Sequence, residues 1–208
     1  MKRKLNKRSV ALLVSLAVIL TAAVGVTLAY IFTNTDALQN IFTPAQVSCA
    51  VVENGSTTEN KGNIVYTGDI KSNVQIKNTG DTDAYIRVAV VITWKSADGT
   101  KVWAQKPVEG TDYSITYPTD TDWVEGADGY YYYTKSVPPT DGSDLTGILI
   151  NEAKQLKPCS QEGYYLSIEI VASAIQASPD NVVGSQWSNE KVTITASNGT
   201  LSVVKKED

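Results

Sequence analysis

Long stretches of the chain alternate apolar and polar residues with a period of two, which is typical of β-strands with one buried face. Residues 70–78 (IKSNVQIKN) and 164–176 (YYLSIEIVASAIQ) follow this pattern, and the even-numbered positions 166–174 form the apolar face of the second segment. Residues 84–95 (AYIRVAVVITWK) are apolar on both faces. We therefore expect a central strand there, covered on both sides in its C-terminal half.

Turn signals separate these segments at short intervals. Asn198-Gly199 lies between two alternating segments, 191–196 and 200–204, and predicts a terminal hairpin with a type I′ turn. A first strand is expected over 46–53, whereas residues 152–156 suggest one helical turn. About nine or ten short strands with little helix are typical of an antiparallel β-sandwich or jelly roll.

The N-terminal segment departs from this alternation. Residues 1–8 carry five basic side chains, and residues 9–32 are 24 consecutive residues without a charge. A basic start, an apolar middle and a small-residue exit predict a secretory signal peptide cleaved between Ala29 and Tyr30. An uncleaved membrane anchor stays open as an alternative, because an apolar run of this length can span a bilayer of about 30 Å.

These patterns divide the chain into three parts. They are a signal peptide (1–29), an N-terminal segment (30–46) and a β-sandwich domain (47–208). The expected fold class is all-β: a jelly-roll-like antiparallel β-sandwich preceded by the apolar signal helix. Cleavage would leave 179 residues, a length that suits one domain.

Charge and residue usage narrow the functional classes. Removing the five basic residues of the signal from the 18 in the chain leaves 13 against 22 acidic residues, a net charge of −9. An acidic exported protein is a poor candidate for nucleic-acid binding, which relies on neutralising phosphates. Cys49 and Cys159 are the two cysteines, and an even count in an exported chain permits one disulfide; two free thiols are the alternative.

Several of these residues also carry a resemblance to a known family. The signal exit Gly25–Asp36 (GVTLAYIFTNTD), the following Asn40–Thr43 (NIFT), and the strand–turn–strand segment Val74–Val88 resemble the exported TasA/camelysin-like proteins of Gram-positive bacteria. The segments 123–133 and 174–187 are similar to further stretches of that group. Together these motifs cover nearly the whole chain, and their combined order carries the resemblance.

The resemblance implies a jelly-roll domain, a signal cut by a SipW-type signal peptidase, and export to the cell surface or biofilm matrix. Fibre-forming members donate their freshly exposed N-terminal segment as a strand to the next subunit. The matching positions lie within 30–52, and the apolar candidates for the donor strand are Tyr30, Ile31, Phe32, Ile41 and Phe42. The best-known fibre former lacks cysteines, so this chain departs from it at Cys49 and Cys159.

An enzymatic function has little support in the sequence. Camelysin relatives have been classed as metalloproteases, but this chain has no histidine, which is the commonest zinc ligand and the usual general base. The carboxylate pairs Asp120/Asp122 and Asp141/Asp144 lie in turn-like contexts, where Asp is expected for local backbone bonding. No catalytic residue, cofactor or metal ligand is therefore assigned.

One binding surface is a candidate instead. Trp123, Tyr131 and Tyr133 would form a sugar-stacking surface if their rings were exposed, although alternating tyrosines in a strand more often put half of their rings in the core. Arg87, within an apolar strand, is expected to snorkel or to pair with a carboxylate.

The sequence thus predicts a secreted, non-enzymatic structural subunit of the cell surface or biofilm matrix. Its expected partners are other copies of itself, other matrix or surface proteins, and a signal peptidase during export, with membrane contact only through the N-terminal segment. The alternatives are a monomeric surface adhesin or carbohydrate-binding module, and a membrane-anchored envelope protein.

Overall fold

The computed structural model of the protein describes residues 45–54, 56–57 and 63–206, which belong to one compact unit, Ala45–Asp208. The predicted cleavage site at Ala29 and Tyr30 lies outside the described residues. So do the predicted donor residues Ile31, Phe32, Ile41 and Phe42.

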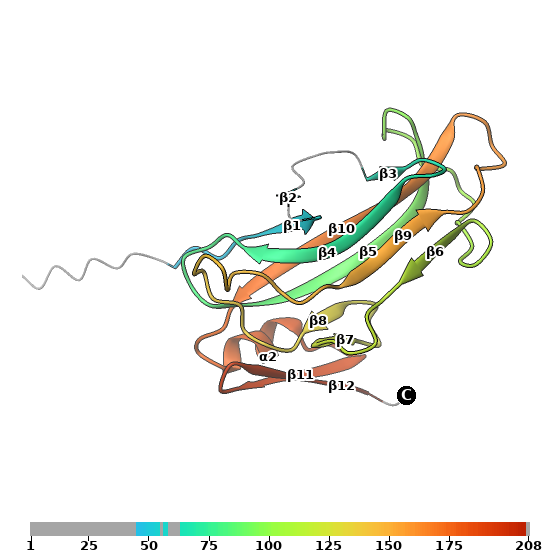
Figure 1. Cartoon of the computed structure of the whole chain (residues 1–208). Helices are drawn as coiled ribbons and strands as arrows, with labels where there is room; N and C mark the ends of the chain where they lie inside the picture. Colours follow the sequence, from blue (N-terminus) through green and yellow to red (C-terminus); the bar gives the residue numbers. More distant parts are fainter. Residues whose placement is uncertain (1–44, 55, 58–62, 207–208) are drawn as a thin grey trace, which may run out of the picture. The chain divides into compact units, whose positions relative to one another are not determined.

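Two five-stranded antiparallel sheets and a separate hairpin make up the unit (Figure 1). The first sheet has the order β2 (Ser56–Thr57), β1 (Cys49–Glu53), β4 (Ile70–Asn78), β9 (Ile150–Gln155) and β6 (Tyr113–Thr116). The second has the order β3 (Ile64–Val65), β10 (Tyr164–Gln176), β5 (Ala84–Ser96), β8 (Tyr131–Tyr133) and β7 (Trp123–Glu125). A short helix, α2 (Asn181–Trp187), precedes the hairpin of β11 (Val192–Ser197) and β12 (Thr200–Lys205).

The main core is built from both five-stranded sheets, so the expectation of an all-β fold is confirmed. The first sheet contributes Val74, Ile76, Ile150 and Ala153, and the second contributes Ile86, Val88, Trp94, Leu166 and Ile168. Burying each large aliphatic side chain contributes about 1.5–3 kcal/mol. The predicted apolar face of 164–176 is the one that turns toward this core.

A second core lies on the other face of β5. Tyr85 and Tyr132 pack there with Trp187 of α2 and with Ile194 of the hairpin. On this second face of β5, Tyr85 near the N-terminal end is therefore fully buried and Arg87 is half-buried, whereas Val91 is 39% exposed. The expectation that the C-terminal half is covered on both sides is wrong, because α2 and the hairpin pack beside the opposite end of the strand.

The structure corrects one local assignment and adds a helix that the sequence did not predict. Residues 150–155 form a strand rather than ending in a helical turn, because β9 is paired on both sides, with β4 and with β6. The segment 181–187 is a helix, although it contains the poor helix formers Val182, Val183 and Gly184. A side chain at Gly184 would lie 2.8 Å from the Ile194 carbonyl oxygen, so close packing against the hairpin requires glycine there.

The terminal hairpin follows the prediction. Asn198 and Gly199 both have positive φ angles, 50° and 74°, as a type I′ turn demands. The register pairs Ser197 with Thr200 directly across this turn. Among the described residues, no helix is both long enough and apolar enough to cross a membrane.

Candidate functional site

The outer edge of β10 lacks a pairing strand over most of its length in the described part of the second sheet. On one side, β10 pairs with β5 over its whole length, from Tyr164 to Gln176. On the other side, β3 pairs only with Leu166 and Ser167. Within the described part of the chain, no strand pairs with this side of β10 over residues 169–176, a length of about 26 Å at roughly 3.3 Å per residue.

The hydrogen bonding shows which backbone groups face this open edge. The Ile168 amide donates to the Asn63 carbonyl oxygen at 2.8 Å, so it points away from β5. Amides two residues apart on a strand point to the same side. The amides of Ile170, Ala172 and Ala174 therefore point outward as well, beyond the end of β3.

Burial changes at the same point along the strand. Leu166 and Ile168, beside β3, are both fully buried. The next core-facing residues, Ile170, Ala172 and Ala174, are half-buried although they pack against the same core. These three residues are thus less covered than those beside β3, although β1 of the first sheet lies close to β10. Two of the three are small, and no described strand pairs with this edge.

The predicted sugar-stacking surface is contradicted. Trp123 is 7% exposed and Tyr133 is 8% exposed, and their rings pack together at 5.1 Å in the main core. The indole nitrogen of Trp123 donates to the Gly147 carbonyl oxygen at 2.9 Å. Tyr131 is half-buried and stacks on Tyr117 at 5.2 Å. These rings serve packing because β7 and β8 turn them toward the interior.

Arg87 lies between two aromatic rings. Its guanidinium carbon is 4.4 Å from the centre of the Tyr130 ring and 4.7 Å from that of Trp187. Cation–π attraction therefore accommodates the charge. Arg87 forms no ion pair with a carboxylate in the described part of the chain, so that part of the expectation is wrong.

The predicted disulfide between Cys49 and Cys159 is also contradicted, since both are free thiols. Cys49 lies opposite Asn78 at one end of β4, whereas β9, which precedes Cys159, ends beside Ile70 at the other. These ends are separated by eight residues, or about 26 Å at roughly 3.3 Å each. A disulfide needs Cα atoms within about 7 Å. Burial raises the pKa of the Cys49 thiol.

One acidic residue of each pair considered for catalysis has a structural partner. Asp122 pairs with Lys135 at 2.8 Å, and Asp144 pairs with Lys77 at 2.9 Å. In the described ranges, no group of three or more His, Cys, Asp or Glu residues is arranged to hold a metal ion.

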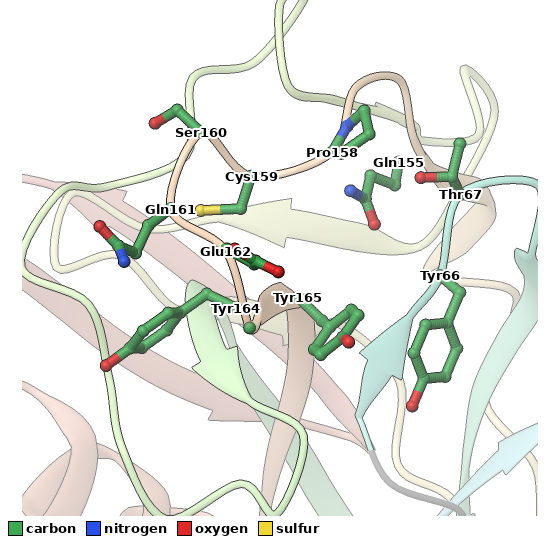
Figure 2. A pocket seen from close by; sticks show the side chains of 11 residues that line it. Tyr66, Thr67, Gln155, Pro158, Cys159, Ser160, Gln161, Glu162, Tyr164 and Tyr165 are labelled. Atoms are coloured by element: carbon green, nitrogen blue, oxygen red, sulfur yellow. The ribbon is translucent and has the colours of Figure 1, made fainter.

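A pocket of about 540 Å³ lies at the end of the core near the start of β10 (Figure 2). Its lining comes from the turn after β3, the end of β9, the loop 156–163 and the start of β10. Gln155, Tyr66, Glu162 and Tyr165 are among its side chains. No pattern in the sequence predicts this pocket, because the helical turn expected over 152–156 would not place Gln155 on the inward face of a strand.

Comparisons with protein-family models, with curated proteins and with solved structures find no match to this chain. The resemblance to the TasA/camelysin-like group therefore remains a prediction from sequence.

Proposed function

We propose that the protein is a secreted structural subunit of the bacterial cell surface or biofilm matrix, and that it assembles by strand addition. The finer fold we propose is a jelly-roll-like sandwich, supported by two antiparallel five-stranded sheets with a shared core. The observation that carries the proposal is the outer edge of β10 over residues 169–176, with which no strand of the described ranges pairs.

An unpaired edge of this kind is a template for another chain. Outward amides and carbonyls along one side of a strand bind an incoming strand in the same way as a sheet ladder. Natural sheet edges are usually protected by charge, proline or a bulge. The segment 169–176 (EIVASAIQ) contains Glu169 as its sole charged residue and has no proline.

The side chains at this edge fit an apolar donor. Ala172 and Ala174 are small and half-buried on the core side, so an inserted strand could place larger side chains over them. The predicted N-terminal segment 30–46 supplies Ile31, Phe32, Ile41 and Phe42. In this proposal, the segment of one copy completes the second sheet of the next copy.

A pair of proline substitutions tests the edge. Ala172→Pro removes an outward amide that no described strand uses, whereas Val171→Pro removes an amide directed toward β5. We expect Ala172→Pro to fold with near-normal stability and to lose fibre assembly in electron microscopy, because proline is tolerated at sheet edges but cannot donate to a ladder. Val171→Pro should lower stability itself, because it removes a ladder hydrogen bond to β5 in the middle of the sheet.

Deleting residues 30–44 tests the donor. The truncated protein should remain folded and fail to form fibres by itself. Unchanged fibres from either Ala172→Pro or the truncated protein would overturn strand addition. N-terminal sequencing of the exported protein tests secretion, because the proposal requires a chain that begins at Tyr30.

A further inference from the structure

The pocket at the end of the core contains a buried polar group that the fold does not satisfy. Gln155 ends β9 on the same face as Ala153, which is part of the main core. Its side chain is 6% exposed. The amide nitrogen donates to the Lys157 carbonyl oxygen at 2.7 Å, but the amide oxygen Oε1 has no hydrogen-bond partner among the residues that the structure describes.

A buried acceptor without a donor is unfavourable unless a ligand or water supplies one. An apolar residue would avoid this cost at a core-facing position, and such departures from a local rule are expected at functional sites. Figure 2 shows the Gln155 amide among the lining side chains, with its oxygen turned toward Tyr165. The pocket wall therefore contains a buried acceptor that lacks a hydroxyl or N–H donor among the described residues.

Aromatic rings border the same space. Tyr66 is 48% exposed, and its ring meets that of Tyr165 edge-on, with 5.1 Å between centres. Tyr164 lines another part of the pocket and packs near Trp103 at 6.4 Å. The Tyr66 backbone is held by the turn in which the Asp69 amide donates to the Tyr66 carbonyl oxygen at 2.9 Å. A fixed, half-exposed ring of this kind is suited to stacking on an apolar ligand face.

The charges of the residues that line the pocket indicate which charge a ligand can carry. Of the described residues that line the pocket, Glu162 alone carries a charge, and none is a lysine or an arginine. Phosphate, sulfate and carboxylate ligands are recognised by such cations, so an anionic ligand is disfavoured. Thr67, Ser160 and Gln161 add hydroxyl and amide groups that exchange hydrogen bonds with neutral polar ligands.

From these observations we infer that the pocket binds an uncharged saccharide. A sugar ring offers hydroxyl donors for Gln155 Oε1 and an apolar C–H face for Tyr66. The volume of about 540 Å³ lies within the range of small-ligand sites. The site is separate from the open edge, because it adjoins the first residues of β10 whereas the edge occupies 169–176. A structural subunit with such a site would hold neutral matrix polysaccharide as well as its neighbours.

The test uses the exported protein and saturation-transfer NMR, which detects ligand binding in monomers and assemblies alike. The probes are cellotriose, maltotriose and the trimer of N-acetylglucosamine, with trigalacturonate as the acidic comparison. We expect at least one uncharged trimer to bind with a Kd of about 1 mM or tighter. Trigalacturonate should bind about tenfold more weakly or not at all, because Glu162 repels it and no cation attracts it.

Substitutions locate the binding to the pocket. Tyr66→Ala and Gln155→Leu should each weaken binding about tenfold, whereas Tyr66→Phe keeps the ring and should stay within about twofold. Tyr66→Ala alters a half-exposed side chain, so it tests the site even if Gln155→Leu fails to fold. Ala172→Pro should bind sugar normally, which separates this inference from strand addition.

Two results would overturn the inference. One is no binding of any uncharged trimer at about 10 mM, which would mean that only solvent satisfies Gln155 Oε1. The other is binding that both Tyr66→Ala and Gln155→Leu leave unchanged, which would place the sugar elsewhere on the protein.

Discussion

Replacing Tyr132 with phenylalanine removes a single buried hydroxyl at the centre of the second core. Tyr132 is fully buried, and its hydroxyl donates to Asp128 Oδ2 at 2.7 Å. The same carboxylate oxygen accepts from the Asn189 side chain at 2.9 Å. These contacts join β8 to the segment that leads from α2 into the hairpin, so the hydroxyl links parts of the fold that are far apart in sequence.

The expected cost follows from the type of hydrogen bond. A bond to a charged group contributes about 1.5–3 kcal/mol, and phenylalanine preserves the ring against Trp187. We therefore expect Tyr132→Phe to lower the free energy of unfolding by about 1.5–3 kcal/mol. Tyr130→Phe is the matched control, because it keeps the ring over Arg87 and has no hydroxyl contact of this kind in the described region. It should change stability by less than about 0.5 kcal/mol.

The pH dependence gives an independent check on the same hydroxyl. Burial, together with the bond to Asp128, raises the pKa of Tyr132 to about 12, above its ordinary value of 10.0. Because the pKa is raised in the folded state, the stabilisation from the protonated hydroxyl is complete below pH 10 and is lost as the pH rises through about 12. Tyr132→Phe should lack this alkaline loss.

The Asp128 carboxylate makes the stability of the fold depend on pH in the acidic range. Burial alone would raise the pKa of Asp128, but hydrogen bonds from Tyr132 and Asn189 outweigh it, and the pKa is lowered from 3.8. Its contribution is therefore present above pH 3.8 and is lost as the pH falls through the lower folded-state value. Urea unfolding at several pH values measures both effects. Equal stability of Tyr132→Phe and Tyr130→Phe at neutral pH would refute the assigned role of the hydroxyl.

Three further predictions follow from packing and side-chain chemistry. Ile168→Ala should cost about 2–5 kcal/mol in urea unfolding, because its side chain is fully buried in the main core; a loss below about 1 kcal/mol would contradict that packing. Cys49 and Cys159 should both be alkylated after denaturation without reductant, and native Cys49 should react slowly because burial raises its pKa; a mobility change on reduction would contradict the free-thiol assignment. Arg87→Gln should lose about 0.5–2 kcal/mol of cation–π stabilisation, measured by thermal unfolding, and an unchanged midpoint would argue against it.

Strands with strict alternation were the most predictable elements. The expected segments 70–78 and 164–176 coincide with β4 and β10. The expected faces of β4 hold only from Val74 onward, because Ile70 is 54% exposed and Lys71 is buried, and the positive φ angle of Asn73 lies where the alternation shifts. The Asn198-Gly199 turn was equally predictable, since few residues tolerate two successive positive φ angles. In each case, local chemistry and tertiary packing favour the same conformation.

Other features depend on contacts that no short segment encodes. The sequence 150–155 has weak alternation, and pairing on two sides makes it a strand. Helix α2 forms against the hairpin despite its poor propensity. Trp123 and Tyr133 could not be placed inside or outside from spacing alone, because either face of β7 and β8 could have met the core. The inward direction of Gln155 can be predicted only once residues 150–155 are known to form a strand.

Amide hydrogen exchange tests the central proposal most directly. In monomeric protein, the outward amides of Ile170, Ala172 and Ala174 should exchange fast, while those of Val171 and Ser173, directed toward β5, should be protected. In assembled protein, strand addition predicts that the three outward amides become protected as well. Equally fast exchange of these three amides in assemblies would contradict strand addition at β10.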